Sequence, residues 1–365
     1  TPTAMVCYFR PLVRHDTPRT ATANPLAGGA LWFDHCARDD RDGSVTLVPA
    51  GDVPAQILTR LTAPRAAIAG LAMDRTRIMG ILNVTPDSFS DGGLHAGDDA
   101  ALDHARKMMA DGAEIIDIGG ESTRPGAALI PDAEEAARIT PTIRALAAQG
   151  GVPVSVDTRK SAVAQSAIDA GAAIVNDVSG LTHDPALADY CAAHDLPICI
   201  MHTQGDPQTM QDDPRYDDVL LDVYDFLEMQ IRVLEAKGLS RKRIIVDPGI
   251  GFGKTLEHNL ALLRGLSLFH ALGCPVLLGA SRKRFIGTIG GATEPAARMP
   301  GSLAVALGAA AQGVQIVRVH DVSETRQALR LWTAIIPGAP DPADPGQPAH
   351  TQKTDTSAEH AGQQA

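Results

Sequence analysis

The chain has 365 residues, of which 44% are hydrophobic, 21% are charged and only 4% are aromatic, and its net charge is −11. The length allows one large domain or two ordinary ones, and the composition is typical of a globular protein with an aliphatic core. The negative charge argues against a nucleic-acid-binding protein, which needs a basic face, although an anion can still bind where cations gather in a cleft.

Residues 1–74 come before any repeated pattern. Within them, residues 28–58, GGALWFDHCARDDRDGSVTLVPAGDVPAQIL, predict a small hairpin and a helix. The sequence assigns no role to this N-terminal extension. Five scattered cysteines without Cys-x-x-Cys spacing, and the lack of a basic-then-apolar leader in the chain as given, favour a reducing compartment, and we expect the cytoplasm.

From residue 77 to residue 336 one pattern repeats. A short aliphatic run ends in polar residues and glycine, and a stretch with the composition of a helix follows. Eight such runs occur, at residues 78–83, 114–120, 152–158, 172–178, 197–202, 243–249, 275–281 and 314–320. Continuous apolar runs of this length are typical of strands buried on both faces, as in a parallel sheet. Helical patterns include residues 98–113, 132–150, 161–172, 217–238 and 324–335.

Eight β-then-α units predict an α/β fold, a (β/α)8 TIM barrel over residues 75–337, because about 250 residues is typical of that architecture. A doubly wound open sheet is the alternative, but it usually carries a Gly-rich turn after its first strand, which this sequence lacks. Residues 338–365 are rich in Pro, Gly and Gln, so we expect a disordered tail. The most apolar long window, residues 301–319, is interrupted by Gln312 and Gln315, which argues against a membrane span.

The carboxyl ends of the eight predicted strands all carry polar or charged side chains. In chain order these are Asn83, Asp117, Asp157, Asn176 with Asp177, His202, Asp247, Ser281, and Arg318 with His320. Any one of them could be a helix cap or a turn residue. Because barrel enzymes place their chemistry at this rim, a polar group after every strand predicts an active site.

The carboxylates and amides of the rim suit two kinds of ligand. An ionised Asp can accept two parallel N–H bonds from the edge of an amino-pyrimidinone ring, which points to a flat, nitrogen-rich heterocycle. The same carboxylates could instead hold a divalent metal ion, and the sequence leaves both interpretations open.

Cations gather after the seventh and eighth strands, where barrels commonly bind phosphate. Arg318 ends a buried strand and therefore needs an anionic partner, whereas Arg284 is interpreted as solvated surface. Residues 248–255, PGIGFGKT, resemble a P-loop, but Pro248 stands where the first glycine belongs, so this interpretation is rejected. The glycines of this stretch would instead allow the backbone to approach a flat ligand closely.

Seven motifs occur in a fixed order: GILNVTPDSFSDGG (80–93), IIDIGGESTRPGA (115–127), VSVDTRK (154–160), IVNDVSG (174–180), DPGIGFGK (247–254), GASRK (279–283) and RVHDV (318–322). Together they resemble bacterial dihydropteroate synthase, a pterin-binding TIM-barrel family and the target of sulfonamides, over residues 77–336. The resemblance implies a transferase of folate biosynthesis that joins 6-hydroxymethyl-7,8-dihydropterin diphosphate to 4-aminobenzoate, releases diphosphate and uses Mg²⁺. It also implies a homodimer that packs through the late barrel helices.

The resemblance further implies a role for each motif residue. The catalytic set is Asn83, Asp91, Lys283, Arg318 and His320, with Asn83 as the magnesium ligand. The pterin-binding residues are Asp157, Asn176, Met201, Asp247, Gly251 and Lys283. Diphosphate is expected to bind Asn83, Thr123, Arg318 and His320. The aminobenzoate pocket is expected to contain Phe89, Thr123, Arg124, Pro125, Phe252 and Ser281.

Residues 80–93 resemble the family's first mobile loop, a lid that closes when diphosphate and metal are bound, and we expect Asp91 to help position it. A closed lid keeps water away from the reacting centre. Residues 123–125 resemble part of the second mobile loop. The sequence departs from the family at Thr203, where Met is more common beside the pterin pocket.

Two other functions compete with the synthase. A pterin-binding methyltransferase domain would share the Asp and Asn residues that bind pterin, but would lack the combined STRPG, SRK and RVH set. A non-catalytic paralogue would have lost Arg318, His320 or the loop residues. All of these residues are present, so the synthase is favoured.

Overall fold

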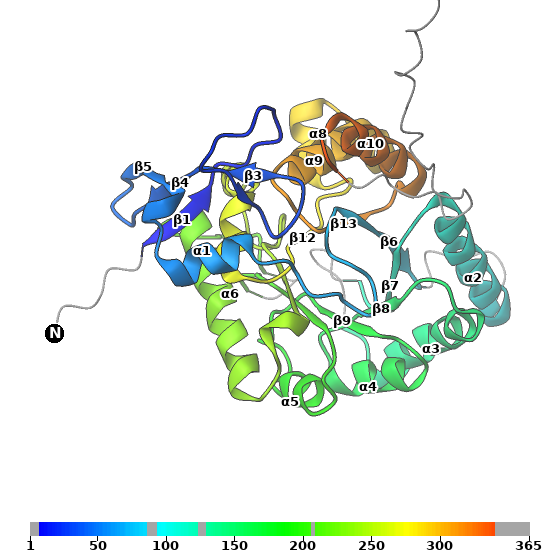
Figure 1. The fold of residues 1–365 in the computed structure, drawn as a ribbon. Helices are drawn as coiled ribbons and strands as arrows, with labels where there is room; N and C mark the ends of the chain where they lie inside the picture. Colours follow the sequence, from blue (N-terminus) through cyan, green and yellow to red (C-terminus); the bar gives the residue numbers. More distant parts are fainter. Residues whose placement is uncertain (1–6, 86–92, 123–128, 206–208, 340–365) are drawn as a thin grey trace, which may run out of the picture.

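The computed structural model describes residues 7–85, 93–122, 129–205 and 209–339. Its centre is a barrel of eight parallel strands with helices around it (Figure 1). The strands are β6 (Arg77–Asn83), β7 (Ile115–Gly119), β8 (Val154–Asp157), β9 (Ile174–Asp177), β10 (Ile198–Met201), β11 (Ile244–Asp247), β12 (Leu277–Leu278) and β13 (Ile316–Val319). Each apolar run of the sequence forms one of these strands, and the TIM-barrel prediction is confirmed.

The strands pair in an order that brings the first and last repeats together. β6 pairs with β7 on one side and with β13 on the other, and the sheet runs from β11 through β6 and β13 to β12. A parallel bridge between Val246 and Val276 then joins β11 to the residues that lead into β12. This bridge closes the barrel, so its polar strand ends share a single rim.

Helices connect the strands and cover the outside of the barrel. They are α2 (Gly93–Asp111), α3 (Asp132–Gln149), α4 (Ser161–Asp169), α5 (Ala186–Ala193), α6 (Val219–Ala236), α7 (Leu256–Arg264), α8 (Arg284–Gly290), α9 (Met299–Ala311) and α10 (Val322–Ile335). Short 3-10 turns are η1 (Ala50–Asp52), η3 (Arg241–Arg243), η4 (Leu266–Leu272) and η5 (Pro295–Arg298). The predicted helical stretches are all found, within a few residues at their ends.

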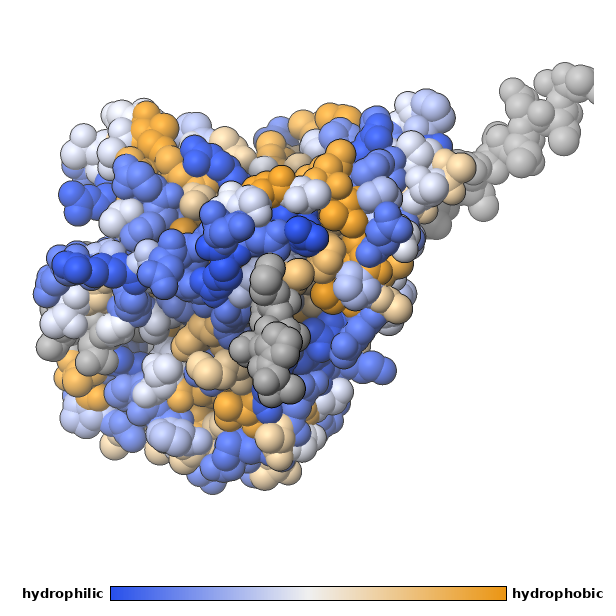
Figure 2. Space-filling view, turned by 90° about the vertical axis from the view of Figure 1, so that its left-hand side faces the viewer, coloured by the Kyte–Doolittle hydropathy of each residue, from blue (hydrophilic) through white to orange (hydrophobic). Residues whose placement is uncertain are grey.

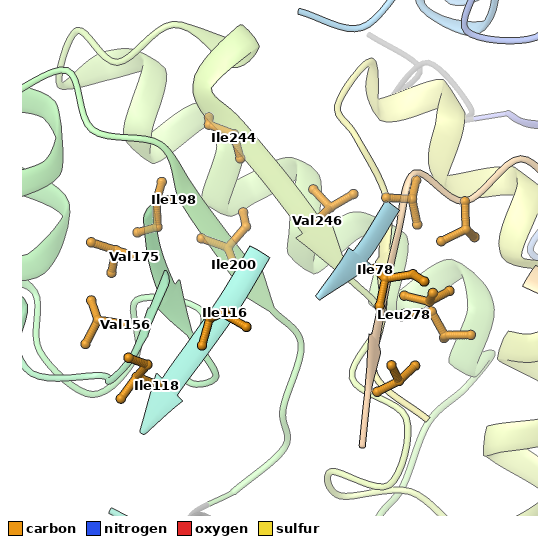
Figure 3. Close-up of a cluster of buried hydrophobic side chains, with 14 of the residues drawn as sticks. Ile78, Ile116, Ile118, Val156, Val175, Ile198, Ile200, Ile244, Val246 and Leu278 are labelled. Atoms are coloured by element: carbon orange, nitrogen blue, oxygen red, sulfur yellow. The ribbon is translucent and has the colours of Figure 1, made fainter. Parts of the chain in front are cut away.

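The main core lies between the strands and the helices. Branched aliphatic side chains from neighbouring strands gather there, among them Ile116, Ile118, Val156, Val175 and Ile200 (Figure 3). Side chains alternate between the two faces of a strand, so these residues leave the intervening positions for the barrel interior. The sequence therefore separates a packing face from a face that carries polar groups.

Residues 8–62 form a small layer beside α6 (Figure 1). Its antiparallel sheet consists of β1 (Tyr8–Pro11), β4 (His35–Asp39) and β5 (Val45–Pro49). β2 (Asn24–Pro25) pairs with β3 (Trp32–Phe33), and α1 (Ala55–Thr62) follows the sheet. The β4–β5 hairpin and α1 confirm the hairpin and helix expected from the sequence.

Tyr8 fixes this N-terminal layer to the barrel. Its side chain is only 2% exposed and packs with Leu221 of α6 and Leu268 of η4. The Tyr8 hydroxyl donates a hydrogen bond to Asp225 Oδ2 (2.8 Å), and Arg41 pairs with the same carboxylate. The layer is therefore held by a buried aromatic contact with a charged network around it.

A segment just before β6 forms the floor of the barrel. Ile68 and Met73 are buried in a cluster with the inward-facing residues at the amino ends of the strands, which are Met79, Ile115, Ile174, Cys199, Ile245, Leu277 and Ile316. This apolar floor keeps water out of the interior from below. The polar strand ends lie at the opposite end of the barrel, whereas the charged Arg77 at the floor end of β6 is paired with Asp74 and Glu114.

The surface is mixed in character. Figure 2 shows hydrophilic residues over much of one face, with apolar residues between them. Within the described ranges, no helix has the length and apolar character that crossing a membrane requires. Residues 340–365, for which we expected disorder, lie outside the described residues.

Candidate active site

The alternation of side chains along each strand builds the polar rim. On β7, Ile115 belongs to the apolar floor, so Asp117, two residues further on, faces the same interior. The strand register places Gly119 beside Asp157, and Asp157 beside Asn176. Carboxylate and amide groups from neighbouring strands are therefore brought into one layer above the floor.

Arg318 joins two of these carboxylates across the barrel. Its Nε donates to Asp117 Oδ2 (2.6 Å) and its Nη2 donates to Asp157 Oδ2 (2.8 Å). Asn176 Nδ2 donates to the same oxygen of Asp117 (3.0 Å). The expectation that Arg318 needs an anionic partner is confirmed, and its partners are two aspartates of the rim itself.

The other oxygens of these two aspartates face no donor. Asp117 Oδ1 and Asp157 Oδ1 are buried and have no hydrogen-bond partner among the described residues. Leaving a buried acceptor unsatisfied costs about 1–3 kcal/mol. These atoms are therefore acceptors that a bound ligand with N–H groups would satisfy.

Burial changes the protonation of the rim carboxylates. It raises the pKa of Asp157 to about 7, although the nearby Arg318 favours the ionised form. Burial also raises the pKa of Asp247, against the opposing effect of Lys283. Groups with such shifts are common at functional sites because they change charge when a ligand binds.

The loops after β11 and β12 meet beside Asp247. Gly249 N donates to Asp247 Oδ1 (2.8 Å), and the Lys283 ammonium donates to the carbonyl of Ile250. Lys283 Nζ also lies 4.6 Å from the centre of the Phe252 ring. Burial lowers the pKa of Lys283 to about 8, with Asp247 acting in the opposite direction. The structure therefore brings Asp247, Lys283 and Phe252 together.

Glycine is required at one point of this arrangement. Gly251 has a φ of +82°, and a Cβ atom there would lie 3.2 Å from the Cδ atom of Lys283. A side chain would be strained by the backbone and would push on the lysine. Gly251 thus allows the loop to pack on Lys283, and the close approach of this backbone to a flat ligand stays a prediction.

His320 and Ser281 are in contact at the edge of the rim. Ser281 Oγ lies 2.9 Å from His320 Nδ1 and accepts a hydrogen bond from the His320 backbone N–H (3.2 Å). The neighbouring Arg282 pairs with Asp321, which joins the loop after β12 to the residue that follows His320. Arg284 is exposed, as expected.

Comparisons with known proteins agree with this geometry. Residues 79–320 match the model of a family described as pterin binding enzyme. The dihydropteroate synthase of Escherichia coli (strain K12) is 46% identical over 266 residues, which cover 73% of this chain and 94% of that protein. The Xanthomonas albilineans dihydropteroate synthase solved with 4-aminobenzoic acid is 46% identical, with a TM-score of 0.70, and the match covers 74% of this chain and 98% of that one. The same enzyme in complex with 7,8-dihydropteroate has a TM-score of 0.68 at 43% identity over 74% of this chain and 98% of that chain.

The chain belongs to the dihydropteroate synthase family. The match extends over nearly the whole length of these relatives, so neither a methyltransferase domain nor a non-catalytic paralogue is favoured. The matched region begins at residue 79, which places the N-terminal layer outside the part described by the family model.

Several residues assigned from the family resemblance remain predictions. Phe89, Asp91, Thr123, Arg124 and Pro125 all lie outside the described residues. Two others have known positions: Asn83 is half-buried at the end of β6, and Met201 is buried at the end of β10. Both strand ends belong to the same rim as Asp157 and Asn176.

Asp177 lies at the rim in sequence but does not face the interior. Its side chain accepts hydrogen bonds from Ser179 N (2.8 Å) and Leu181 N (2.6 Å). It therefore shapes the turn after β9, which is the ordinary role of an Asp in that position. Alternation along the strand explains why Asn176 faces the barrel interior and its neighbour does not.

One buried ionic cluster was missed by the sequence analysis. Glu121 accepts hydrogen bonds from Arg159 Nη2 (2.9 Å) and Lys160 Nζ (2.7 Å). Lys160 also donates to the carbonyl of Ile130 (2.7 Å). The two adjacent cations after β8 are the signal that could have revealed it, because cations next to a buried strand need anionic partners.

Proposed function

We propose that this chain condenses 6-hydroxymethyl-7,8-dihydropterin diphosphate with 4-aminobenzoate to give 7,8-dihydropteroate and diphosphate. The observation that carries the proposal is the buried group of Asp117, Asp157 and Arg318 at the rim. It offers unsatisfied carboxylate oxygens to a heterocycle rich in N–H groups and a guanidinium to an anion. Family membership supports the same reaction, because the solved relatives hold 4-aminobenzoic acid or 7,8-dihydropteroate.

The pterin ring is bound by Asp157, Asn176 and Asp247, with Lys283 beside them. Ionised carboxylates accept the parallel N–H groups of an amino-pyrimidinone edge. The Asn176 amide can donate to a ring nitrogen or oxygen. Met201 and Gly251 provide apolar surface and backbone next to these groups, at the ends of β10 and in the loop after β11.

Diphosphate is bound where Arg318 and His320 end the last strand. The Arg318 side chain is 20% exposed, so its guanidinium can contact an anion while its Nε and Nη2 remain paired with aspartates. The two carboxylates hold the guanidinium in place before the substrate arrives. A fixed cation of this kind stabilises negative charge as it develops on the leaving group. Thr123 adds a hydroxyl donor in this proposal.

We propose that the arylamine binds at Phe252 and Ser281, and the family resemblance implies that Phe89, Arg124 and Pro125, outside the described residues, complete this pocket. Arg124 is the cation in this set that can pair with the benzoate carboxylate. The Phe252 ring offers a flat apolar surface to the benzene ring. This arrangement directs the amine toward the methylene carbon of the pterin.

The reaction needs no protein nucleophile. The bond between the pterin methylene carbon and the diphosphate oxygen breaks, and both of its electrons leave with diphosphate. The electron-deficient methylene is stabilised by the electron-rich dihydropterin, and the neutral amine nitrogen forms the new C–N bond and loses a proton. Water would also attack this carbon, so an enclosed site is needed, and Asp91 in the loop after β6 is expected to help close it.

The residues of the site fit Mg²⁺ as a companion of diphosphate. The described residues hold no group of three His, Cys, Asp or Glu side chains that could bind a metal ion without substrate. Asn83 offers an amide oxygen at the end of β6, and Mg²⁺ is usually bound by few protein oxygens together with substrate phosphates. When bound, the ion would neutralise charge on the departing diphosphate.

We also infer a homodimer that works in the cytoplasm. Leu331 and Ile335 lie one turn apart on α10 and are 62% and 66% exposed, which suits burial against a second copy. Cys191, Cys199 and Cys274 are buried and form no disulfide, and cysteines used in this way support a reducing compartment.

The test is product identification. Purified protein is incubated with both substrates and Mg²⁺, and the products are separated by chromatography. The proposal expects 7,8-dihydropteroate only when both substrates are present, with little product when the metal is removed by a chelator. Hydrolysis of the dihydropterin diphosphate without incorporation of the amine would contradict it.

A further inference from the structure

Lys254 is a deeply buried lysine to which neither the family resemblance nor the proposed chemistry gives a role. It lies in the stretch that resembles a P-loop, and its ammonium contacts groups of the protein. The residue is only 3% exposed and lies between the loops that follow β10 and β11. A buried lysine needs acceptors for its three N–H groups.

Lys254 Nζ has three such acceptors. It lies 2.9 Å from His202 Nδ1, and it donates to the carbonyls of Phe252 (2.9 Å) and His202 (3.3 Å). Burial and the adjacent ammonium lower the pKa of His202 to about 2, so the imidazole is neutral and its Nδ1 can accept. One ammonium thus ties the loop after β11 to the first residue after β10.

The groups that Lys254 joins are next to the pterin residues. His202 N donates to the Asp247 carbonyl (3.0 Å), so it is fixed beside the carboxylate that binds the ring. Phe252 is the residue whose ring faces Lys283. Close packing supports the connection: a Cβ atom on Gly249 would lie 1.9 Å from the His202 carbonyl oxygen. A small shift of this loop would therefore move Asp247, Phe252 and Lys283 relative to one another.

Electrostatic interactions also connect Lys254 to Asp247. The titratable groups that face Lys254 are His202, Asp247 and Lys283. Burial lowers the pKa of Lys254, whereas Asp247 favours its charged form. In turn, Lys254 contributes to keeping Asp247 ionised. An ionised Asp247 is the form that accepts N–H groups from a pterin.

We propose that Lys254 is a positioning residue that, through His202 and the Phe252 carbonyl, holds the loop after β11 in the geometry that binds the pterin ring. The proposal rests on the proposed function, because it takes the pterin to be the ligand of Asp247. Loss of the Lys254 donors should therefore raise KM for the pterin substrate much more than KM for 4-aminobenzoate.

The experiment compares Lys254→Met with the parent in the full-length protein. Met keeps the length of the side chain and removes the three donors. We expect KM for dihydropterin diphosphate to rise by about tenfold or more, the equivalent of losing one hydrogen bond to a charged group. KM for 4-aminobenzoate and kcat should change by less than about threefold. Lys107→Met, at an exposed lysine of α2, is the matched control.

A second pair of variants keeps the test valid if Lys254→Met does not fold. His202→Asn retains an acceptor near the Nδ1 position and should stay within about threefold of the parent in KM for the pterin substrate. His202→Leu removes the acceptor and should raise that KM by about tenfold. Folded variants with an unchanged KM for the pterin substrate, or with equal changes in both KM values, would overturn the proposal.

Binding of 6-hydroxymethyl-7,8-dihydropterin, measured by calorimetry, distinguishes a failure of the Lys254 role from a failure of the proposed function. If the parent binds the pterin but makes no dihydropteroate, the proposed reaction fails while the role of Lys254 can still be tested by the loss of binding in Lys254→Met. If the parent turns over and Lys254→Met binds the pterin as tightly as the parent does, the positioning role fails and the proposed function stands.

Discussion

Arg318 Nε lies 2.6 Å from Asp117 Oδ2, so the last strand of the barrel is joined to the second by an ion pair whose carboxylate is fully buried. The two residues are 201 positions apart in the chain. The pair fixes the guanidinium at the rim, and the family resemblance by itself assigned no role to Asp117. In the proposed function, Asp117 would hold Arg318 in place for the diphosphate.

Replacing Asp117 tests the structural side of this relationship. Asp117→Asn removes the negative charge and leaves Arg318 with only Asp157 as an anionic partner, so the free energy of unfolding should fall by about 3 kcal/mol. Urea unfolding followed by circular dichroism measures the change. Asp195→Asn, which breaks the exposed pair with Arg243, is the control and should cost less than about 0.5 kcal/mol. Equal effects of the two substitutions would show that the buried pair has no special importance.

Replacing Arg318 tests its catalytic role. In the proposed reaction Arg318 is a cation fixed at the leaving group, so Arg318→Ala should lower turnover by about 100-fold or more. Steady-state rates at saturating substrates give the comparison, and Arg243→Ala, on the surface, should leave the rate unchanged. Because Arg318→Ala also leaves Asp117 and Asp157 without their cation, folding must be verified first. Near-normal turnover by the folded variant would exclude the proposed role.

The pH dependence of pterin binding follows from Asp157. Its pKa is raised to about 7 in the free protein, so below pH 7 the carboxyl is mostly protonated and must lose its proton before it can accept N–H groups. The affinity for 6-hydroxymethyl-7,8-dihydropterin should therefore fall as the pH falls from 8 to 6, at a limiting slope of about tenfold per pH unit. This ligand carries no phosphate. The measured pH dependence therefore contains no contribution from the ionisation of a diphosphate group.

Calorimetry at several pH values measures this effect directly. Binding below pH 7 should release a proton, which is detected by the difference in heat between buffers of different ionisation enthalpy. Asp157→Asn should bind more weakly and lose the pH dependence. An affinity that is constant between pH 6 and pH 8 would show that Asp157 does not bind the ring in its ionised form.

The floor of the barrel gives a prediction about stability alone. Ile68 is fully buried, and Ile68→Ala would leave a cavity below the strands, so the free energy of unfolding should fall by about 3 kcal/mol. Met229→Ala, at an exposed position of α6, should change it by less than about 0.5 kcal/mol. Urea unfolding is the measurement. A small effect at Ile68 would mean that the segment before β6 does not close the barrel as the structure has it.

The sequence predicted the barrel well because each strand carries its own local signal. Ile115 and Ile116 belong to one apolar run, and the polar residue at its carboxyl end marks where the strand meets the rim. The alternation that separates Asn176 from Asp177 is also local, but deciding which of the two faces inward required the position of the floor. The repeated apolar runs with polar ends were therefore enough to predict the fold. They were not enough to predict which single side chains face the barrel interior.

Contacts between distant segments could not be predicted in this way. The partners of Arg318, and the lysine that joins His202 to Phe252, depend on the closed barrel and not on any short motif. The N-terminal layer is a similar case. Its hairpin and helix were expected, but its attachment to α6 rests on Tyr8, a single aromatic residue without a recognisable pattern around it.

The proposed reaction is tested most directly by the stoichiometry of its two products in one incubation. Diphosphate and 7,8-dihydropteroate are measured together over time, with purified protein, both substrates and Mg²⁺. If the chain catalyses the proposed condensation, the two products form in equal amounts at every time point, and omitting 4-aminobenzoate stops the release of diphosphate almost completely. Diphosphate released without an equal amount of 7,8-dihydropteroate would contradict it.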